Sequence, residues 1–480
     1  MFKKRISTII ISSILLSSVS INAKEVASSP LLSPSEQIQN NQASTWLDQE
    51  SYILATNVYL WGSTLVRMEQ VARQYTDMSQ PQNDTSYRAP LNHFGHARRL
   101  PTDQDTDMPT ANRDTLYSSA VVDVSKEPMI LSTPTVNNRY FVINMFDMWH
   151  NLFKYVGSRT TGDHAQKIMI VPPHWQGDAP KGMTVVESQT TKVWLWGRTQ
   201  VFGEKDYPAV HAIQDQYTLT PLSRYLSKDS SDFISPALSP RAGKADDPLR
   251  FYEELGAYLK ANPIPERQQA LLGQFNKIGL SEDGFDRSKL TPSMKIQLEK
   301  AVKDGQQIVA AQSTNPVTLK MKDGWYYSFV LDQFGDDNAL RSLVSHPYLG
   351  GQGAKEAMYP ITYTDAKGQL LSGNNQYTMH FNDEPPVGSF WSVTVYDAKT
   401  KMLISNDIHR FNINDQTPIQ KNKDGSFDLV LSHKKPTDTK QLANWLPTAE
   451  GNFYAITRLY IPSQDILDMK WTVPPINPIK

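Results

Sequence analysis

The sequence of 480 residues contains no cysteine. This absence excludes disulfide bonds, thiol catalysis, and zinc or iron–sulfur sites with cysteine ligands. It also excludes a lipoprotein anchor, which requires a cysteine at the cleavage point. The stability of the chain and any chemistry it performs must therefore come from other side chains.

An excess of charge of either sign is also missing. The 48 Lys and Arg residues are balanced by 49 Asp and Glu residues, and the formal net charge is −1. Such a chain has no long-range field to attract nucleic acid or an anionic membrane surface. The sequence has no Gly-x-Ser-x-Gly elbow, no Walker loop, no dinucleotide glycine fingerprint and no His-Glu-x-x-His motif. We therefore expect no nucleic-acid partner and no cofactor, and no motif identifies a reaction.

Long hydrophobic runs are missing outside the N-terminus. Residues 1–23 are typical of a secretory signal peptide, with basic residues at positions 3–5, an apolar core over Ile6–Val19 and a small residue for cleavage, Ala23. The alternative is a membrane anchor, but the apolar core is shorter than the roughly 20 residues that a span requires. We expect export to a bacterial periplasm or secretion, with no membrane span in the mature chain. Residues 24–45 are rich in Ser, Asn, Gln and Pro and are expected to form a mobile N-terminus.

Aromatic residues (10%) and prolines (31) are abundant, which favours a loop-rich, mainly β fold with a helical insert over a helical bundle. Apolar residues recur at steps of three and four over Asp48–Tyr75, which predicts a long amphipathic helix. Four further segments open with proline and have a helical pattern. These segments are Pro208–Tyr217, Pro248–Ala261, Pro265–Lys277 and Pro292–Gln312.

These elements predict an α+β chain of several domains. The signal peptide and the mobile N-terminus precede a first β domain that carries the N-terminal helix. A helical insert with its connector follows, and a second β domain ends the chain. The predicted boundaries are 1–23, 24–45, 46–205, 206–360 and 361–480.

The two β regions resemble each other. The strand Tyr140–Asp147 ends in an aromatic residue followed by Asp, as does the strand Phe390–Asp397, and Tyr117 precedes the first as Tyr377 precedes the second. A repeated unit of about 90–110 residues made of short strands is typical of a jelly roll or β-sandwich. We predict two such domains related by internal duplication; the alternative is coincidence among residues common in strands. Alternation predicts the core face of the second strand, formed by Trp391, Val393 and Val395.

The densest polar stretch runs from Asn112 through Arg113 and Asp114 to Tyr117, at the start of a predicted strand. If the hairpin folds back, Asp114 lies near a second group of polar residues, formed by Asp147, His150, Arg159 and Arg198. Two carboxylates with a histidine nearby would suit acid–base catalysis by Asp114, Asp147 and His150. The same groups beside Tyr117 would suit binding of a sugar or another polar molecule. The third interpretation is a structural network of Asp–Arg pairs that ties strand ends together.

Three residues are conspicuous in the second half: Trp391, Arg410 and Trp445. The run Asn444–Pro447 is typical of a strand-connecting turn in which a tryptophan plugs the end of a barrel. Exposure of both tryptophans would instead indicate a platform for carbohydrate.

Two patterns raise the question of a metal. His93 and His96 are three residues apart, and Asp103, Asp105 and Asp107 alternate ahead of Asp114. A calcium loop of twelve residues requires Gly at its sixth position and usually Glu at its twelfth, where this chain has Met108 and Asp114. We therefore favour a solvated acidic loop and capping histidines, and expect no metal.

Several motifs together resemble two bacterial families. Asn112–Tyr117, Asn138–Tyr140 and Arg159–Gly162 resemble domain-of-unknown-function family 1254, and Pro385–Asp397 and Asn444–Pro447 resemble its usual partner, family 1214. This resemblance spans roughly residues 50–475. It implies an exported cell-envelope protein with two jelly-roll-like β domains and helical additions, and it implies no catalytic residue.

Three functions remain open. The first is an envelope protein that binds a glycan or a polar small molecule, which an aromatic and polar cleft would favour. The second is a periplasmic hydrolase with paired carboxylates, which requires Asp114 and Asp147 about 5–10 Å apart. The third is a structural or assembly protein of the envelope, which a broad exposed apolar patch would favour.

Overall fold

The computed structural model describes residues 34–80, 82–106, 109–229, 231–235, 238–314 and 319–479. The described residues from Asp48 onward form one compact unit, separate from the described residues before it. The predicted signal peptide and the start of the predicted mobile N-terminus lie outside the described residues. No helix in the described part of the chain combines the length and apolarity that crossing a membrane requires. The fold is α+β, as the sequence predicts.

The predicted amphipathic helix is α1 (Pro34–Thr76). Its predicted apolar stripe is buried, with no member more than 9% exposed: Leu54, Val58, Trp61, Leu65, Met68 and Val71. The helix begins at Pro34, inside the segment predicted to be mobile. Proline is tolerated in the first helical turn, and no further proline interrupts the chain before Thr76. The predicted start of the helix, Asp48, is therefore too late, because the Ser and Asn content of residues 34–45 indicated an irregular segment.

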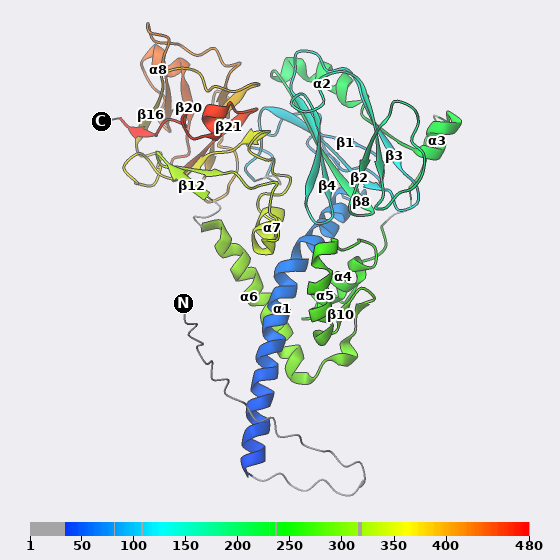
Figure 1. The fold of residues 1–480 in the computed structure, drawn as a ribbon. Helices are drawn as coiled ribbons and strands as arrows, with labels where there is room; N and C mark the ends of the chain where they lie inside the picture. Colours follow the sequence, from blue (N-terminus) through cyan, green and yellow to red (C-terminus); the bar gives the residue numbers. More distant parts are fainter. Residues whose placement is uncertain are drawn as a thin grey trace, which may run out of the picture. The chain divides into compact units, whose positions relative to one another are not determined.

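Nine strands build the first β region: β1 (Gly95–His96), β2 (Thr115–Asp123), β3 (Met129–Thr133), β4 (Phe141–Asp147), β5 (Leu152–Gly157), β6 (Gln166–Val171), β7 (Thr184–Glu187), β8 (Lys192–Gln200) and β9 (Thr218–Pro221). They form two sheets, in the orders β1-β2-β8-β4-β5 and β7-β6-β3-β9 (Figure 1). Val122 and Leu195 of the first sheet share one apolar cluster with Leu131 and Ile170 of the second. The two sheets therefore pack face to face.

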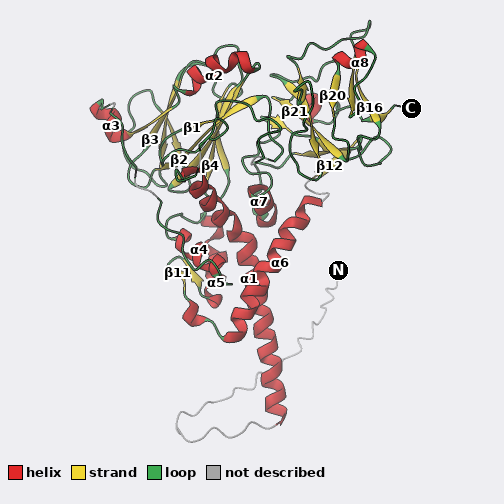
Figure 2. Cartoon of the chain, turned by 180° about the vertical axis from the view of Figure 1, so that it is seen from behind, coloured by secondary structure: helices red, strands yellow, loops and turns green. Residues whose placement is uncertain are grey.

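Helices dominate the middle of the chain: η1 (Glu204–Asp206), α2 (Tyr207–Gln214), α3 (Leu222–Ser227), α4 (Arg250–Leu259), η2 (Glu266–Gln268), α5 (Gln269–Phe275), η3 (Asn276–Ile278), η4 (Arg287–Lys289), α6 (Pro292–Ala311), η5 (Gln312–Thr314) and α7 (Asn338–Ser345). A short hairpin, β10 (Leu280–Ser281) and β11 (Gly284–Phe285), lies among them. The four predicted helices correspond to α2, α4, α5 and α6 (Figure 2). Proline at or near their first turns thus predicted where they begin.

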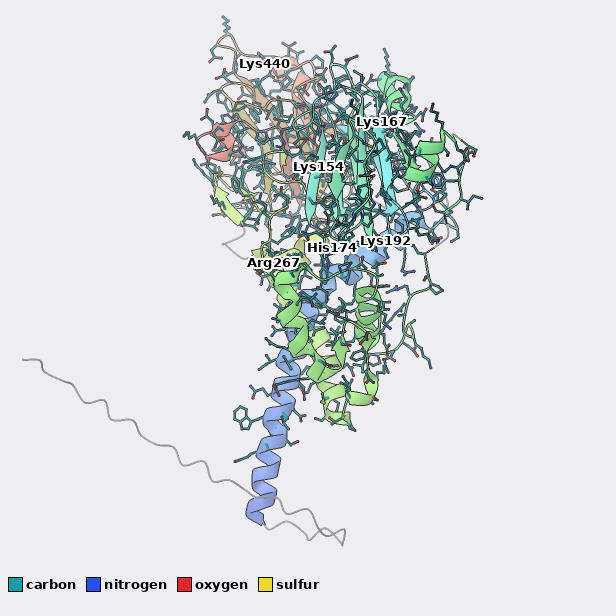
Figure 3. The ribbon with its side chains drawn as sticks, turned by 45° about the vertical axis from the view of Figure 1, so that its right-hand side comes forward. Lys154, Lys167, His174, Lys192, Arg267 and Lys440 are labelled. Atoms are coloured by element: carbon teal, nitrogen blue, oxygen red, sulfur yellow. The ribbon has the colours of Figure 1, made fainter. Side chains whose placement is uncertain are left out.

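The first sheet is buried on both faces. Along β8, Val193 and Leu195 join the core between the sheets, whereas Trp194 and Trp196 join α1, α4 and α5 on the other face. Lys192, labelled in Figure 3, adds an ion pair to α1, with its Nζ 2.6 Å from Glu69 Oε1. A tryptophan-rich strand therefore separates a β core from a helical layer.

The second β region contains β12 (Leu319–Lys322), β13 (Trp325–Ser328), β14 (Ala357–Met358), β15 (Ile361–Thr362), β16 (Gln376–Phe381), β17 (Trp391–Asp397), β18 (Asn412–Asn414), β19 (Phe427–Ser432), β20 (Trp445–Pro447), β21 (Phe453–Tyr460) and β22 (Asn477–Pro478), with helices α8 (Thr439–Ala443) and α9 (Gln464–Leu467). One sheet has the order β12-β13-β15-β21-β17-β18, with β14 also on β21, and the other has β20-β19-β16-β22. Trp391, Val393 and Val395 of β17 lie in the shared core, which confirms the predicted face.

The two β regions share a pattern of strand pairing. The run β2-β8-β4-β5 corresponds to β15-β21-β17-β18, and β7-β6-β3 corresponds to β20-β19-β16, with a parallel pair at the same place in each. Duplication stays a prediction, as does the jelly-roll assignment. One predicted equivalence is wrong: Tyr117 lies in β2, but Tyr377 lies in β16, the counterpart of β3. The similarity of short sequence motifs suggested this equivalence, but such motifs do not determine which strands pair in a sheet.

Candidate functional site

Asn112 opens β2 and links the two β regions. Its Oδ1 accepts hydrogen bonds from the backbone N–H groups of Asp114 (2.7 Å) and Thr115 (3.1 Å). Its Nδ2 donates to the hydroxyl of Tyr460, on β21, at 2.8 Å. An Asn side chain that satisfies its own turn is a common device at such positions. Asn112 is 2% exposed, so it stabilises the turn and the contact between the β regions.

Asp114 also serves this contact. Its Oδ2 accepts from Ser392 Oγ at 2.5 Å, and its Oδ1 accepts from the side-chain amides of Asn412 (2.8 Å) and Asn414 (3.3 Å). These partners belong to β17 and β18, and Asp114 itself is 2% exposed. Both carboxylate oxygens are therefore used to hold the second β region.

Arg113 points away from Asp114's partners. Its guanidinium lies over the ring of Phe411, 4.9 Å from the centroid, and its Nη1 donates to the carbonyl of Pro101. Burial lowers the pKa of Arg113, and its Nε is buried without a hydrogen-bond partner among the described residues.

Asp114 and Asp147 lie at opposite ends of the same sheet. The carbonyl of Asp114 accepts from the backbone N–H of Val201, just beyond β8, whereas Asp147 pairs with Val193 near the start of β8. Eight residue steps along a strand, from 193 to 201, amount to about 26 Å. The predicted acid–base pair is therefore wrong, because the pairing of β2 and β4 with β8 places the two carboxylates at opposite ends of the strands.

Asp147 and His150 shape the turn after β4. Asp147 Oδ1 accepts from the backbone N–H groups of Trp149 and Asn151, both at 2.9 Å, and Oδ2 accepts from Asn151 Nδ2 at 2.8 Å. Burial nevertheless raises the pKa of Asp147. His150 is fully buried, and burial followed by the charge of Arg341 lowers its pKa to about 3. Neither side chain reaches solvent to act on a substrate there.

Arg159 and Arg198 lie between the β regions. Arg159 forms an ion pair with Glu356, whose other oxygen accepts from Tyr140 OH at 2.8 Å. The Arg198 guanidinium lies 5.3 Å from the ring centroid of Tyr117, its cross-strand neighbour, and donates to the carbonyl of Gly350 at 3.3 Å. Burial alone would lower the pKa of Arg198, but surrounding phenols raise it on balance.

The condition for an aromatic platform in the second β region, exposure of both tryptophans, is not met. Trp391 is 1% exposed and Trp445 is 6% exposed, because both belong to strands with buried faces. Arg410 Nη1 donates to the carbonyls of Ala443 and Trp445, each at 2.9 Å. Trp391, Arg410 and Trp445 therefore stabilise this region and present no surface for a sugar.

The histidines and the acidic loop have protein partners of their own. His93 Nδ1 lies 2.9 Å from the carbonyl of Leu91, and His96 Nδ1 lies 2.9 Å from Ser118 Oγ. Of the predicted acidic loop, Asp107 and Met108 lie outside the described residues. Within the described ranges, no three His, Asp or Glu side chains are grouped so that they could hold a metal ion.

A cavity of about 140 Å³ lies beside the start of β2, and we call it the Tyr117 cavity. Tyr75, Tyr87 and Tyr117 give it an aromatic wall. The ring of Trp196 stacks on Tyr117 with centroids 4.5 Å apart and meets Tyr87 edge-on at 5.0 Å. This volume holds several waters or one small organic molecule.

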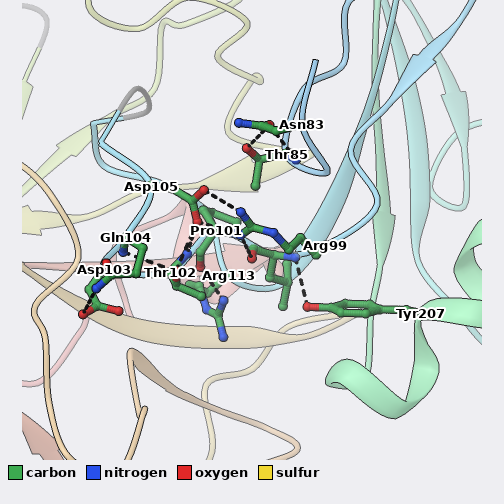
Figure 4. Close-up of polar contacts among 11 residues, drawn as sticks. Asn83, Thr85, Arg99, Pro101, Thr102, Asp103, Gln104, Asp105, Arg113 and Tyr207 are labelled. Atoms are coloured by element: carbon green, nitrogen blue, oxygen red, sulfur yellow. Dashed lines mark hydrogen bonds and ion pairs between the residues drawn. The ribbon is translucent and has the colours of Figure 1, made fainter. Parts of the chain in front are cut away.

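The lining of the Tyr117 cavity also has a polar part. It includes Arg99 and Asp105, joined by two parallel hydrogen bonds of 2.7 and 2.8 Å (Figure 4). These bonds from Arg99 lower the pKa of Asp105. Thr115 also lines the cavity, is 1% exposed, and its Oγ1 has no hydrogen-bond partner among the described residues. A buried hydroxyl without a partner is costly, so it marks a place where a ligand or water would bind.

The polar stretch Asn112–Tyr117 therefore contains both structural residues and candidate binding residues. Tyr117 and its neighbours Thr115 and Leu116 line the cavity, whereas Asn112 and Asp114 hold the β regions together. Of the cavity residues between 74 and 105, sequence reasoning singled out only Asp105, and for a possible metal site. They belong to a helix end and an irregular segment, where no periodic pattern indicates which side chains face inward.

Two family models and several solved structures resemble this chain. The VPA0106 protein of Vibrio parahaemolyticus is 26% identical, with a TM-score of 0.70 over 90% of this chain and 100% of that one. An uncharacterized protein from Burkholderia cenocepacia is 13% identical, with a TM-score of 0.42 over 93% of this chain and 97% of that one. No curated protein matches the chain. As its motifs predict, residues 91–221 match the family model described as "Protein of unknown function (DUF1254)" and residues 356–464 match the one described as "Protein of unknown function (DUF1214)".

Proposed function

We propose that this protein binds a small polar molecule, of about the size of a monosaccharide, in the Tyr117 cavity. The observation that carries the proposal is the unpartnered hydroxyl of Thr115 in a cavity with an aromatic wall. Aromatic rings suit the apolar face of a sugar or another small ring, and a few fixed polar groups orient it. This combination of an aromatic wall and a free polar group is typical of a binding site.

Binding is better supported than hydrolysis or assembly. Asp114 and Asp147 are too far apart for a paired-carboxylate mechanism, and each is consumed by hydrogen bonds within the protein. For an assembly role, one broad apolar patch would be required. The large exposed apolar side chains are spread over several elements, with Trp46, Leu47 and Ile53 on α1, Leu226 on α3, Ile296 and Ile308 on α6 and Met321 on β12.

We also propose that the chain acts in the cell envelope after export. The support is the N-terminal sequence, with its basic start, apolar core and Ala23. A periplasmic binding protein requires no membrane span in its mature form, and the −1 net charge suits a role that does not depend on nucleic acid.

A ligand screen with a blocked cavity tests the binding proposal. The full mature chain is titrated with monosaccharides, their acids and small aromatic acids, and binding is followed by calorimetry and by tryptophan fluorescence, since Trp196 contacts the cavity wall. Ala97 lines the cavity and is 5% exposed, so Ala97→Met fills part of it. We expect at least one compound to bind the wild type, and we expect Ala97→Met to abolish the binding of that compound.

The matched control is Ala209→Met, because Ala209 lies exposed on α2. It should leave binding unchanged. If every ligand binds Ala97→Met as tightly as the wild type, or if no compound binds the wild type, the proposal is wrong. Circular dichroism and urea unfolding of both variants separate loss of the site from loss of the fold.

A further inference from the structure

We infer that the second β region positions the wall of the Tyr117 cavity, and that Arg113 is the positioning residue through which it does so. This inference rests on the proposed function and adds a regulation of the same site: binding in the cavity and the contact between the two β regions depend on each other. It follows from the contacts of residues 110–114 and from the hydrogen bond between Arg113 and the cavity lining.

The five residues directly ahead of the cavity strand all contact the second β region. Residues 110–114 precede Thr115, Leu116 and Tyr117, which line the cavity. Each of the five forms a hydrogen bond or a ring contact with the second β region. One partner of each, in order from Thr110 to Asp114, is Tyr454, Tyr396, Tyr460, Phe411 and Ser392. The cavity strand therefore begins from a segment that the second β region holds along its whole length.

Arg113 joins this segment to the cavity lining. Its Nη1 donates to the carbonyl of Pro101, a lining residue (Figure 4). Its guanidinium lies over the ring of Phe411, 4.9 Å from the centroid. Phe411 is 4% exposed and belongs to an apolar cluster of the second β region that also includes Ala111. Arg113 therefore rests on a fixed ring of the second β region while it holds the cavity wall.

The wall that Arg113 holds is irregular. Residues 99–105 form no helix or strand, and three of them line the cavity: Arg99, Pro101 and Asp105. Within the described ranges, hydrogen bonds connect this stretch to other segments at its first three residues, Arg99, Leu100 and Pro101, with the partners Asp84, Tyr207 and Arg113. An irregular stretch with few such bonds opens locally at low cost, so loss of the bond from Arg113 frees part of the cavity wall.

Binding and the contact between the β regions are therefore linked. A freed wall must be ordered again when a molecule binds, and this ordering costs conformational entropy. By thermodynamic reciprocity, a molecule that binds the ordered wall favours the contact between Arg113 and Phe411 by the same factor. Coupled sites typically change each other's affinity by about 5–150-fold, so removal of the contact should weaken binding at least about fivefold.

Substitutions on both sides of the contact test the inference in the full mature chain. The probes are glucose, glucuronate and benzoate, which represent the three classes of the screen, and binding is measured by calorimetry. Arg113→Met removes the donor to Pro101, and Phe411→Leu removes the ring under the guanidinium from a residue that does not line the cavity. Both should weaken binding at least about fivefold. Arg113→Lys keeps a donor and the charge, so it should restore part of the loss.

The matched control is Phe427→Leu. Phe427 is fully buried in the core of the second β region, away from Arg113 and from the cavity lining. The smaller side chain should lower the free energy of unfolding and leave the affinity for the probes unchanged.

Hydrogen exchange gives a readout that overall stability does not move, when each variant is fully folded. The backbone N–H groups of Arg99, Leu100 and Thr102 are hydrogen-bonded, so they are protected in the wild type. They should exchange faster in Arg113→Met and Phe411→Leu, and at the wild-type rate in Phe427→Leu. Unchanged exchange in the first two variants would overturn the inference.

The outcomes separate the two proposals. If Arg113→Met and Phe411→Leu bind the probes as tightly as the wild type, while Ala97→Met does not bind them, positioning by the second β region is overturned and binding in the cavity stands. Equal loss of affinity in Phe411→Leu and Phe427→Leu would also overturn it, because the cause would be general destabilisation. If no probe binds the wild type, the inference and the proposed function fail together.

Discussion

Three buried strand threonines allow a test of the cavity against the core. Thr115, Thr133 and Thr457 are 1%, 4% and 0% exposed, and the Oγ1 of each has no hydrogen-bond partner among the described residues. Only Thr115 of these three lines the Tyr117 cavity. Valine has nearly the same shape as threonine and carries no hydroxyl, so the three Thr→Val variants differ in surroundings and not in chemistry.

The expected magnitudes follow from those surroundings. A buried hydroxyl without a partner costs about 1–3 kcal/mol, so Thr133→Val and Thr457→Val should raise the free energy of unfolding by about 1 kcal/mol or more. Thr115 lines a cavity that water can enter when no ligand is bound, so Thr115→Val should change stability by less than about 0.5 kcal/mol. One hydrogen bond to a ligand contributes about 0.5–1.5 kcal/mol, which corresponds to a two- to tenfold loss of affinity in Thr115→Val alone.

Urea unfolding measures the first quantity and calorimetric titration the second. The reasoning is refuted if Thr115→Val stabilises the protein as much as the two control variants do and binds ligand like the wild type. In that case the Thr115 hydroxyl would be an ordinary core group, and the Tyr117 cavity would have no role in binding.

Other predictions follow from the residues that the structure assigns to stability. Asp114→Ala leaves the hydrogen-bond donors of Ser392, Asn412 and Asn414 unpaired, so it should lower the free energy of unfolding in urea by at least about 3 kcal/mol. Asp114→Asn keeps an acceptor for these donors and should lower it clearly less; equal losses would contradict the role of these hydrogen bonds. The raised pKa of Asp147 means that its charged form is penalised in the fold. The wild type should therefore gain stability relative to Asp147→Asn as the pH falls from 7 through the raised pKa toward about 4, and a constant difference would contradict this. Mass spectrometry of protein exported from a bacterial host should give a chain that begins directly after Ala23; an uncleaved N-terminus would contradict the signal peptide.

Local patterns in the sequence predicted the elements well. The three- and four-residue steps from Leu54 to Val71 predicted the buried stripe of α1, and alternation predicted the core face of β17. Proline predicted the starts of α2 and α6, since Pro208 and Pro292 both lie in a first turn. Each of these features depends on residues close in sequence, which is why periodicity and turn chemistry sufficed.

Features that depend on distant segments were not predictable in the same way. The proximity of Asp114 and Asp147 depends on how β2 and β4 are placed along β8, and no local pattern specifies that register. The partners of Asp114 lie nearly 300 positions later, on β17 and β18. Tyr117 was singled out for its polar neighbours, but its role in a cavity depends on the end of α1 and on residues 85–105, which only the fold brings together.

The most direct test of the central claim is a crystal structure of the mature protein soaked with the ligand that binds most tightly in the screen. The account predicts difference density in the Tyr117 cavity, with a polar ligand atom within hydrogen-bond distance of Thr115 Oγ1 and a ring against Tyr117. An empty cavity at saturating ligand, with the ligand bound elsewhere on the chain, would contradict it.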